Sequence, residues 1–349
     1  MTNGQEQVNE EAKNLKSTFD SLKTKKIFLI GFGSLIGVAI VASLAFGTYR
    51  VYAKTGTDGF TVGVSKFLNL PIARVNGRSV KYSEYVSDLA AIKNMQNYDK
   101  KNNGPTSALT ETNLSDQVMY RQVNNIFIST LANKYGVKVE KTDLENVKKD
   151  ILEKQFGSMA EAEKAIKERY GWSLEEFEKK VINQFIVQNK LVEKLSSDQV
   201  SKDKVKETAQ SVLDQIKNGA DFGEMAKKYG ADGTASKGGD LGWFGKGDMV
   251  PQFETVAFEL KKGELSPNVV ETQFGYHILI VDDKKTEKVK DEKGKSVNKE
   301  MVKARHILFA YPTLESLLNQ EIKTAKIKVY GKVNDPFKEL QKNLNAGAN

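Results

Sequence analysis

The chain is 349 residues long, with 39% hydrophobic and 28% charged residues. Single hydrophobic cores usually serve fewer residues than this, so the length predicts two modest domains with accessory segments. The formal charge of +8 is spread along the sequence without a nucleic-acid motif, and no nucleic-acid partner is expected. The absence of Cys excludes disulfides, thiolate metal sites and Cys nucleophiles, and two His are too few for a His-rich metal site.

An uncharged run over residues 27–49 is the first feature in chain order. As a helix it would extend roughly 34 Å, enough to cross a hydrocarbon core of about 30 Å once. We therefore expect a single N-terminal transmembrane helix, with residues 1–26 as a cytoplasmic tail. More basic residues closely precede the run than follow it, which favours this orientation only slightly, and the orientation rests mainly on the resemblance described below. A cleaved signal peptide is the alternative, since Ala45-Phe46-Gly47 fits a small-x-small cleavage site, although signal peptides usually have shorter apolar regions.

Helices dominate the segment that follows a linker over residues 50–71. Two short strands around a turn at Asn76-Gly77 come first. Amphipathic helices are then expected near residues 83–102, 115–135, 142–156, 159–170 and 173–195. Their apolar faces predict a helical domain over residues 72–200. The alternating segment 325–331 is expected to pair with the strand near residues 72–75, so that residues 311–349 return to this domain.

Several motifs follow one another within residues 201–310. They read ADFGEMAKKYG, GGDLGWFGKGDMVPQFETVAFEL, KKGELS and VVETQFGYHILIV. Together, in this order, they resemble the body of a parvulin-type peptidyl-prolyl cis-trans isomerase. The preceding helices, with GSMAEAEKAIKERYGWSLEEFEKKV, resemble the chaperone domain of bacterial extracytoplasmic foldases of the SurA and PrsA kind. The resemblance implies an α+β fold in which a parvulin domain with a four-stranded antiparallel sheet is inserted into the helical domain.

The resemblance also implies an apolar proline pocket formed by Leu241, Met249 and Phe253, with Phe274 beside it. Packing in a hydrophobic core is the alternative for each of these residues. Rotation about a peptide bond crosses a barrier of about 18–20 kcal/mol, because planarity preserves the amide resonance. A pocket that holds the proline ring and favours the twisted amide lowers this barrier without a nucleophile, a metal or a cofactor.

A polar centre of His277, His306, Thr272 and Asp232 is implied by the same resemblance. Both His precede Ile-Leu, in YHILIV and RHILFA, which favours a shared role over two separate structural His. Paired imidazoles can fix each other's tautomer through one N–H···N bond, with Thr272 as a further partner. Asp232 is then expected near the substrate carbonyl in an electrostatic role, and a turn-forming Asp is the alternative.

One strand is displaced relative to ordinary parvulins, in which the strand of the RHIL type precedes the long helix. Here residues 195–206 enter that helix without such a strand, and the strand occurs instead at residues 304–309. A hairpin turning near Lys293-Gly294, about midway between the two His, would bring their strands together antiparallel. We therefore expect a circularly permuted parvulin domain. A second, truncated parvulin repeat is the alternative, but no second GGDLG motif follows.

The sequence thus predicts a peptidyl-prolyl isomerase and chaperone that assists the folding of exported proteins at the outer face of the membrane. The expected partners are unfolded or folding proteins with X-Pro bonds, together with the membrane through one helix; no cofactor or metal is expected. The main alternative is a non-catalytic, membrane-anchored holdase, followed by a cell-envelope scaffold protein. An X-Pro isomerisation assay distinguishes the enzyme from the holdase.

Overall fold

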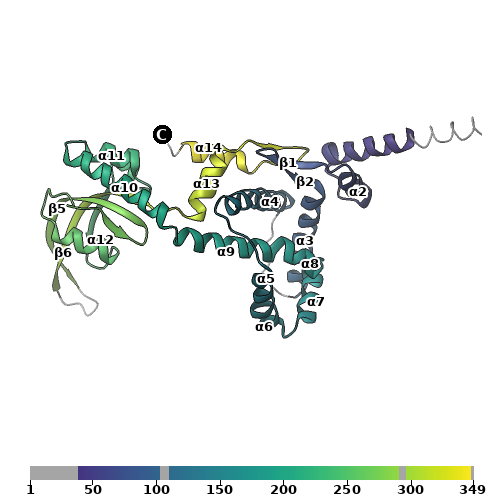
Figure 1. Ribbon diagram of the computed structural model, residues 1–349, viewed down its shortest axis with the longest axis horizontal. Coiled ribbons are helices and arrows are strands. Elements are labelled where there is room, and N and C mark those ends of the chain that lie inside the picture. Colours follow the sequence, from purple (N-terminus) through teal and green to yellow (C-terminus); the bar gives the residue numbers. More distant parts are fainter. Residues whose placement is uncertain (1–37, 103–109, 291–295, 347–349) are drawn as a thin grey trace, which may run out of the picture. The chain divides into compact units, whose positions relative to one another are not determined.

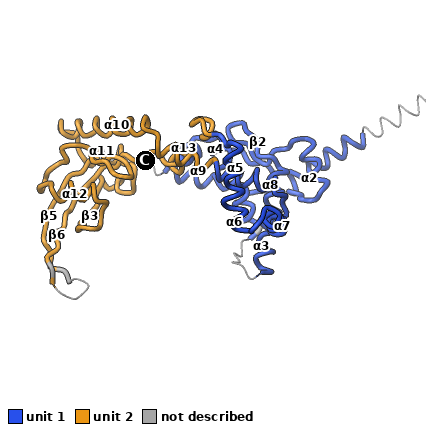
Figure 2. The backbone as a smooth tube through the Cα atoms, turned by 60° about the horizontal axis from the view of Figure 1, so that its bottom comes forward, with its two compact units in different colours: residues 1–130, 138–186, 318–349 blue, residues 131–137, 187–317 orange. Residues whose placement is uncertain are grey.

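The computed structural model describes residues 38–102, 110–290 and 296–346, and Figure 1 traces them in chain order. These residues form two compact units, shown in different colours in Figure 2. Unit 1 contains residues 38–102, 110–130, 138–186 and 318–346, and unit 2 contains residues 131–137, 187–290 and 296–317. Most of unit 2 is therefore inserted in sequence between two parts of unit 1.

A three-stranded antiparallel sheet in the order β2-β1-β7 belongs to unit 1. Its strands are β1 (Pro71–Val75), β2 (Arg78–Lys81) and β7 (Ile327–Val329). Asn76 and Gly77 both have positive φ, as a two-residue hairpin turn requires. β7 pairs with β1 in the register Ala73↔Val329, and the backbone N–H of Lys326 donates to the side chain of Asn76 at 2.8 Å. The predicted pairing of residues 325–331 with this strand is confirmed.

Apart from the helix of residues 38–49 and the larger sheet with its own helices, all described below, the remaining elements are helical. They are η1 (Arg50–Lys54), α2 (Gly59–Phe67), α3 (Tyr82–Lys101), α4 (Glu111–Lys134), α5 (Lys141–Val147), η2 (Lys148–Glu153), α6 (Lys154–Phe156), α7 (Met159–Tyr170), α8 (Leu174–Phe177), η3 (Glu178–Ile182), α9 (Asn183–Ser196), α13 (Leu314–Thr324) and α14 (Phe337–Ala346). All five predicted helices are present, although the π-helical turns η2 and η3 interrupt two of them. Ser158 and Ser173 cap α7 and α8 by accepting from the backbone N–H three residues on.

Aromatic side chains fill the core of unit 1. Tyr82 and Tyr85 of α3, Phe127 of α4 and Phe337 of α14 are each at most 2% exposed. The ring of Phe337 stacks on that of Tyr120, with the ring centroids 5.2 Å apart. The last helix therefore completes a core many of whose members, such as Phe127, lie some two hundred residues earlier in the chain.

The larger sheet belongs to unit 2 and is antiparallel, with the strand order β3-β6-β5-β4. Its strands are β3 (Asp240–Gly245), β4 (Val270–Thr272), β5 (Gly275–Lys290) and β6 (Ser296–Ala310), and its helices are α10 (Gln199–Lys217), α11 (Phe222–Tyr229), η4 (Ala235–Lys237) and α12 (Pro251–Glu259). One face packs on α10 and α11 through Ile278 and Ile307. The other face packs on α12 through Leu279 and Ala304. The predicted four-stranded antiparallel sheet is confirmed.

β5 and β6 form one long hairpin. Leu279 pairs with His306 and His277 pairs with Leu308, so the two His strands are antiparallel neighbours as predicted. β3 pairs with β6 only as far as Met301. Residues 286–290 and 296–300 therefore extend beyond the third strand as a two-stranded distal ribbon. β6 lies between β3 and β5, which makes it an interior strand of the sheet.

The described part of the chain begins inside the predicted membrane span. Residues 27–37 of that span lie outside the described residues, and residues 38–49 form a helix that continues into η1. Val38, Ile40 and Val41 on this helix are each more than half exposed. Within the described ranges, no helix combines the length and the apolar character needed to cross a membrane.

Candidate active site

The two His side chains come from neighbouring strands and lie on the same face of the larger sheet. Because side chains alternate along a strand, His277 shares its face with Leu279, and His306 shares its face with Ala304. This face packs on α12. The diagonal offset of the pair places the two imidazoles nearly parallel, with their centroids 5.3 Å apart and a 20° angle between the rings. Both side chains are buried.

Hydrogen-bond distances connect the four residues predicted for the polar centre. Thr272 Oγ1 lies 2.9 Å from His277 Nε2, and His277 Nδ1 lies 3.1 Å from His306 Nδ1. His306 Nε2 in turn lies 2.9 Å from Asp232 Oδ2, although these two atoms are not aligned as a hydrogen bond. The backbone N–H of Phe274 donates to Thr272 Oγ1 at 3.2 Å. The structure therefore brings together His277, His306, Thr272 and Asp232.

The chain of contacts is consistent with one set of tautomers. The carboxylate of Asp232 only accepts, so the facing Nε2 of His306 carries its proton and the Nδ1 of a neutral His306 is an acceptor. His277 then donates from Nδ1 to His306, which leaves His277 Nε2 to accept from the Thr272 hydroxyl. Thr272 Oγ1 accepts from Phe274 at the same time. The Thr272 hydroxyl, His277 Nδ1 and His306 Nε2 thus each direct a proton toward the next group, in the direction of Asp232.

Burial keeps both imidazoles uncharged at neutral pH. It is the main cause that lowers the pKa of His277 to about 4, and the neighbouring His306 adds to the effect. Burial also lowers the pKa of His306, although the Asp232 carboxylate opposes the shift. For Asp232 itself, burial favours the neutral form but is outweighed by the hydrogen bonds from Thr234 and by His306, so its pKa is lowered. The site thus combines two neutral imidazoles with one carboxylate.

Apolar side chains lie against the imidazoles. Phe253 of α12 is 3% exposed, and its ring meets His277 and His306 edge-on, with centroid distances of 5.3 and 5.6 Å. Leu241 and Met249 are partly buried and pack in the same cluster as Phe253. Phe274 differs, because its side chain is 53% exposed. Its backbone N–H places it beside Thr272, at the turn between β4 and β5.

Two residues that the sequence reasoning missed hold this centre in place. Thr234 donates to Asp232 Oδ1 from its hydroxyl at 2.6 Å and from its backbone N–H at 3.0 Å. Gly239 has a φ of +84° and accepts from the backbone N–H of His306, and a Cβ at this position would collide with the carbonyl oxygen of His306. The Asp-Gly-Thr turn was a readable signal for Thr234. The role of Gly239 becomes visible only once β6 is placed beside it.

Metal ligands are not gathered here or elsewhere in the described ranges. Across residues 38–102, 110–290 and 296–346, no group of three or more His, Asp or Glu side chains is arranged to hold a metal ion. The side chains of the polar centre are instead engaged with one another.

Comparisons with known proteins give matches for both units. A family model described as a PPIC-type PPIASE domain matches residues 174–285, and one described as a SurA-like N-terminal domain matches residues 30–158. Foldase protein PrsA 2 of Bacillus cereus is 31% identical over 240 residues, which cover 64% of this chain and 82% of that protein. Chaperone SurA of Chromobacterium violaceum is 39% identical over 116 residues, which cover 33% of this chain and 27% of that protein.

A solved structure is also similar. It is the 1.70 Å crystal structure of the peptidylprolyl isomerase PrsA from Bacillus anthracis, with 22% identity and a TM-score of 0.20, covering 64% of this chain and 86% of its own.

The matched model, the four-stranded sheet and the paired His define the protein as one with a parvulin-type peptidyl-prolyl isomerase domain, preceded by a SurA-like domain. Because more than four-fifths of a PrsA foldase aligns with it at 31% identity, the chain belongs to the PrsA foldase family. The predicted resemblance is confirmed for both domains.

Proposed function

We propose that the protein catalyses the cis-trans isomerisation of X-Pro bonds in unfolded or folding proteins. The observation that carries this proposal is the network from Thr272 through His277 and His306 to Asp232, covered by the ring of Phe253. Leu241 and Met249 complete the apolar pocket that receives the proline ring, and Phe274 contacts the substrate from the turn beside it.

Catalysis by this site is electrostatic and requires no covalent step. In the planar amide, resonance places negative charge on the carbonyl oxygen, and this charge decreases as the bond twists. A carboxylate close to that oxygen therefore destabilises the planar ground state more than the twisted transition state. The lowered pKa of Asp232 keeps the carboxylate charged at neutral pH, and the hydrogen bonds from Thr234 hold it beside His306. An acceleration of roughly 10³–10⁵ corresponds to about 4–7 kcal/mol.

The displaced strand supports a circular permutation of the parvulin domain. The family model matches residues 174–285 and stops before β6, the strand that carries His306. β6 nevertheless occupies the interior position between β3 and β5. We propose that the strand which opens an ordinary parvulin domain has moved to its end, with the β5–β6 hairpin as the new connection. The proposed boundaries of the domain are residues 201–310, within a helical domain of residues 72–200 completed by residues 311–349.

Membrane anchoring is the second part of the proposal. The uncharged run over residues 27–49 is long enough for one span, which would leave residues 1–26 in the cytoplasm and the main body outside it, after a linker over residues 50–71. The foldase name of the relatives is consistent with clients that are folding. Proteins emerging at the outer face of the membrane would be the substrates.

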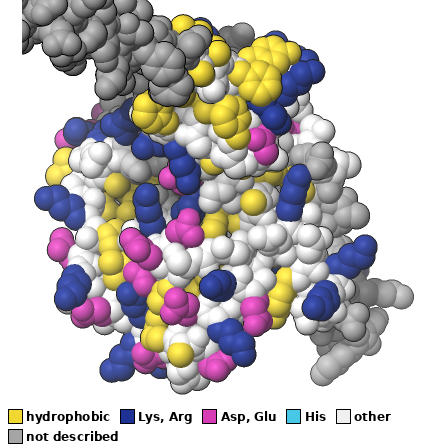
Figure 3. Space-filling view, turned by 90° about the vertical axis from the view of Figure 1, so that its right-hand side faces the viewer, with side chains coloured by type: hydrophobic (Ala, Val, Ile, Leu, Met, Phe, Trp, Pro, Cys, Tyr) yellow, Lys and Arg dark blue, Asp and Glu magenta, His cyan; other side chains and the backbone are white. Residues whose placement is uncertain are grey.

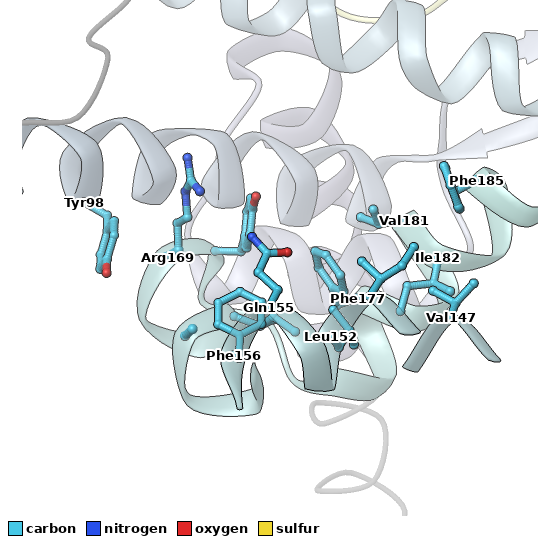
Figure 4. A pocket seen from close by; sticks show the side chains of 14 residues that line it. Tyr98, Val147, Leu152, Gln155, Phe156, Arg169, Phe177, Val181, Ile182 and Phe185 are labelled. Carbon is cyan, nitrogen blue, oxygen red and sulfur yellow. The ribbon is translucent and has the colours of Figure 1, made fainter. Parts of the chain in front are cut away.

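A cavity in unit 1 supports the chaperone activity. It has a volume of about 360 Å³ and is lined by residues of α3, α5, η2, α6, α7 and the helices from α8 to α9. Figure 4 shows these side chains. Its lining includes Ile151, Leu152, Phe156, Phe177 and Phe185. Ile151 and Phe185 are 42% and 46% exposed. An opening with exposed apolar side chains suits apolar segments of unfolded chains, because both sides leave water on contact.

The isomerase proposal is tested with the full chain in detergent micelles or vesicles. NMR exchange spectroscopy measures the cis-trans rate of an X-Pro peptide with and without protein. We expect acceleration that is strongly reduced in Asp232→Asn, because this change removes the charge and keeps the side-chain shape. Suppression of client aggregation without any acceleration would instead establish the non-catalytic holdase.

The chaperone proposal is tested on aggregation of an unfolded client. Phe185→Ser should weaken the suppression of aggregation because it removes an apolar contact from the cavity rim. Val200→Ser on α10 is the matched control, since Val200 is 65% exposed and does not line the cavity. Equal suppression by both variants would remove the cavity from the proposal, and the isomerase rate should be unchanged in either case.

A further inference from the structure

The helix α2 presents an apolar face to solvent. Phe60 and Phe67, seven residues apart and so on one side of the helix, are 46% and 76% exposed, and Leu68 directly after the helix is 38% exposed. Gly63 lies between them on the same side and is also exposed. Other residues of α2, among them Val64, are buried. The helix therefore packs through one side, and its outward apolar side has no cover among the described residues.

The contacts of α2 place it beside the end of the helix that precedes it. The rings of Phe46 and Phe60 have centroids 6.3 Å apart, and Arg50 pairs with Asp58, the N-cap of α2, at 2.8 Å. Gly47 packs so closely on Val64 that a Cβ at Gly47 would come within 2.6 Å of it. Phe46 and Gly47 belong to the uncharged run that ends at Tyr49. With a rise of about 1.5 Å per residue, these contacts lie roughly one helical turn from the end of that run.

Basic side chains accompany the apolar face. Lys66 is exposed within α2, and Lys54 is exposed at the end of η1. Arg50 is the first residue after the uncharged run in the sequence. Figure 3 views the molecule from the side of Figure 1 on which α2 lies, and hydrophobic side chains gather at one edge of that face beside Lys and Arg. Aromatic residues flanked by Lys and Arg are typical of segments at the boundary between hydrocarbon and headgroups.

We propose that α2 lies in the membrane interface, with Phe60, Phe67 and Leu68 inserted among the lipid headgroups and Lys66 and Lys54 facing anionic phosphates. The partner is the bilayer surface itself, because the depth of α2 follows from its contacts with the last turn of the uncharged run. This inference rests on the proposed anchor. Its consequence is that unit 1 is held against the membrane by a second, interfacial element, since α2 also packs on α3.

The experiment exploits the absence of Cys from the chain, which makes any introduced Cys the only labelling site. Gly63→Cys keeps Phe60 and Phe67 in place, and a side chain at Gly63 meets nothing within 4 Å. Glu163→Cys on α7, an exposed position of the same unit, is the matched control. Each full-length variant is labelled with an environment-sensitive fluorophore and reconstituted into phosphatidylcholine vesicles that contain a minor fraction of phosphatidylglycerol. Lipids carrying a quencher in the acyl chain report contact with the bilayer.

At position 63 we expect a blue-shifted emission and severalfold quenching by the labelled lipid, and at position 163 we expect neither. Both effects at position 63 should be lost when Phe60→Ser and Phe67→Ser are added.

Alkaline extraction of the same vesicles tests the anchor separately. A chain that resists extraction while its label at position 63 stays in water overturns the interfacial helix and leaves the anchor standing. A label shielded from water but not quenched by lipid would indicate a second copy of the chain and would also overturn the proposal. Release of the chain by alkali would overturn the anchor and, with it, this inference. The isomerase rate measured on the same vesicles is independent of all three outcomes.

Discussion

A neutral imidazole pair fixes the protonation pattern of the candidate active site. If His306 were protonated at both nitrogens, its Nδ1–H would face the N–H that His277 donates, and one hydrogen bond would be lost in a buried place. The burial that lowers both pKa values therefore preserves the hydrogen bond between the two imidazoles. Thr272 fixes the other end, because its hydroxyl has no second acceptor of comparable distance besides His277.

Acidification should destabilise unit 2 selectively. A His of the unfolded chain titrates near pH 6.5, whereas the pKa of the folded His277 is about 4. Between these values the unfolded state binds a proton that the folded state does not, so the stabilisation is complete above about pH 6.5 and is lost as the pH falls toward 4. At about 1.4 kcal/mol per pKa unit, His277 contributes about 3 kcal/mol, and the lowered pKa of His306 acts in the same direction.

Amide hydrogen exchange of each unit across this pH range measures the effect. Unit 1 is an internal control, because the only two His of the chain are in unit 2. His277→Gln should make the dependence much shallower. An equal loss of protection in both units would show that the two His are not its cause.

Met249→Ala tests the proline pocket. Met249 is partly buried beside Phe253, so the truncation removes contact with the substrate ring at a smaller cost in stability than a fully buried residue would incur. Losing about 1–2 kcal/mol of apolar contact should lower kcat/KM for an X-Pro peptide by roughly five- to thirtyfold. Met159→Ala on the partly buried Met159 of α7 is the matched control and should leave kcat/KM unchanged. An unaltered kcat/KM in Met249→Ala would assign Met249 to the core alone.

For single residues, the sequence predicted the site best where two segments of the chain share a motif. The two His precede the same Ile-Leu pair, and this repetition predicted a pair that the structure brings to 3.1 Å. Asp232 and Thr272 were predicted through the family resemblance, and the structure places both at the ends of that pair. Phe274 was expected beside the pocket, and its exposed side chain leaves that role as a prediction. No local pattern shows that Gly239 must admit the carbonyl of His306, because the two residues are 67 positions apart in sequence.

Among the elements, β6 matters most for the fold of the larger sheet. It is an interior strand, yet it follows the other strands in the sequence, whereas the corresponding strand of an ordinary parvulin domain comes first. Ile307 is fully buried and contributes to the core on the face opposite His306. The sequence predicted a strand over residues 304–309, because RHILFA resembles the strand that opens an ordinary parvulin domain. The observed strand runs from Ser296 to Ala310, because its first half is stabilised by pairing with β5 and not by any apolar pattern of its own.

Ile307→Pro should unfold unit 2. Proline removes a backbone donor from an interior strand, and the smaller ring leaves a cavity in the core, so the free energy of unfolding should fall by about 3 kcal/mol or more. Asn298→Pro in the distal ribbon is the matched control, because there β6 pairs only with β5. We expect loss of isomerase activity and of hydrogen-exchange protection in unit 2 for the first variant, and retention of both for the second. A folded and active Ile307→Pro protein would contradict the interior position of β6 and remove His306 from the active site.

The helices illustrate what local signals can and cannot predict. Ser158 and Ser173 are caps within a few residues of Gly stops, and the helices that they open were predicted with near-exact bounds. The π-helical turns η2 and η3 were not predicted, because their hydrogen-bond shift depends on packing between helices and not on a residue signature. Exposure of Phe67 and Phe185 likewise depends on what the rest of the chain leaves uncovered.

For the whole molecule, the two units should respond to different mutations. Phe337 is fully buried against Tyr120 in unit 1. Phe337→Ala should lower the free energy of unfolding of unit 1 by about 3–5 kcal/mol, and it should leave the isomerase rate unchanged while unit 1 remains folded. Urea unfolding followed by hydrogen exchange of each unit provides the measurement, with Phe67→Ala, at a 76% exposed position, as the control. A parallel loss of protection in unit 2 would show that the units are not independent.

The pairing of β1 with β7 can form only after nearly the whole chain has been synthesised. The hydrogen bond from Lys326 to Asn76 joins residues 250 positions apart. At about 5–20 residues per second, roughly 12–50 s pass between the synthesis of its two partners. β1 therefore spends this time with one edge unpaired, a state in which strands recruit foreign chains. The larger sheet needs no residue beyond Ala310, so it can close first. The isomerase domain of each nascent copy can therefore close before its helical unit is complete.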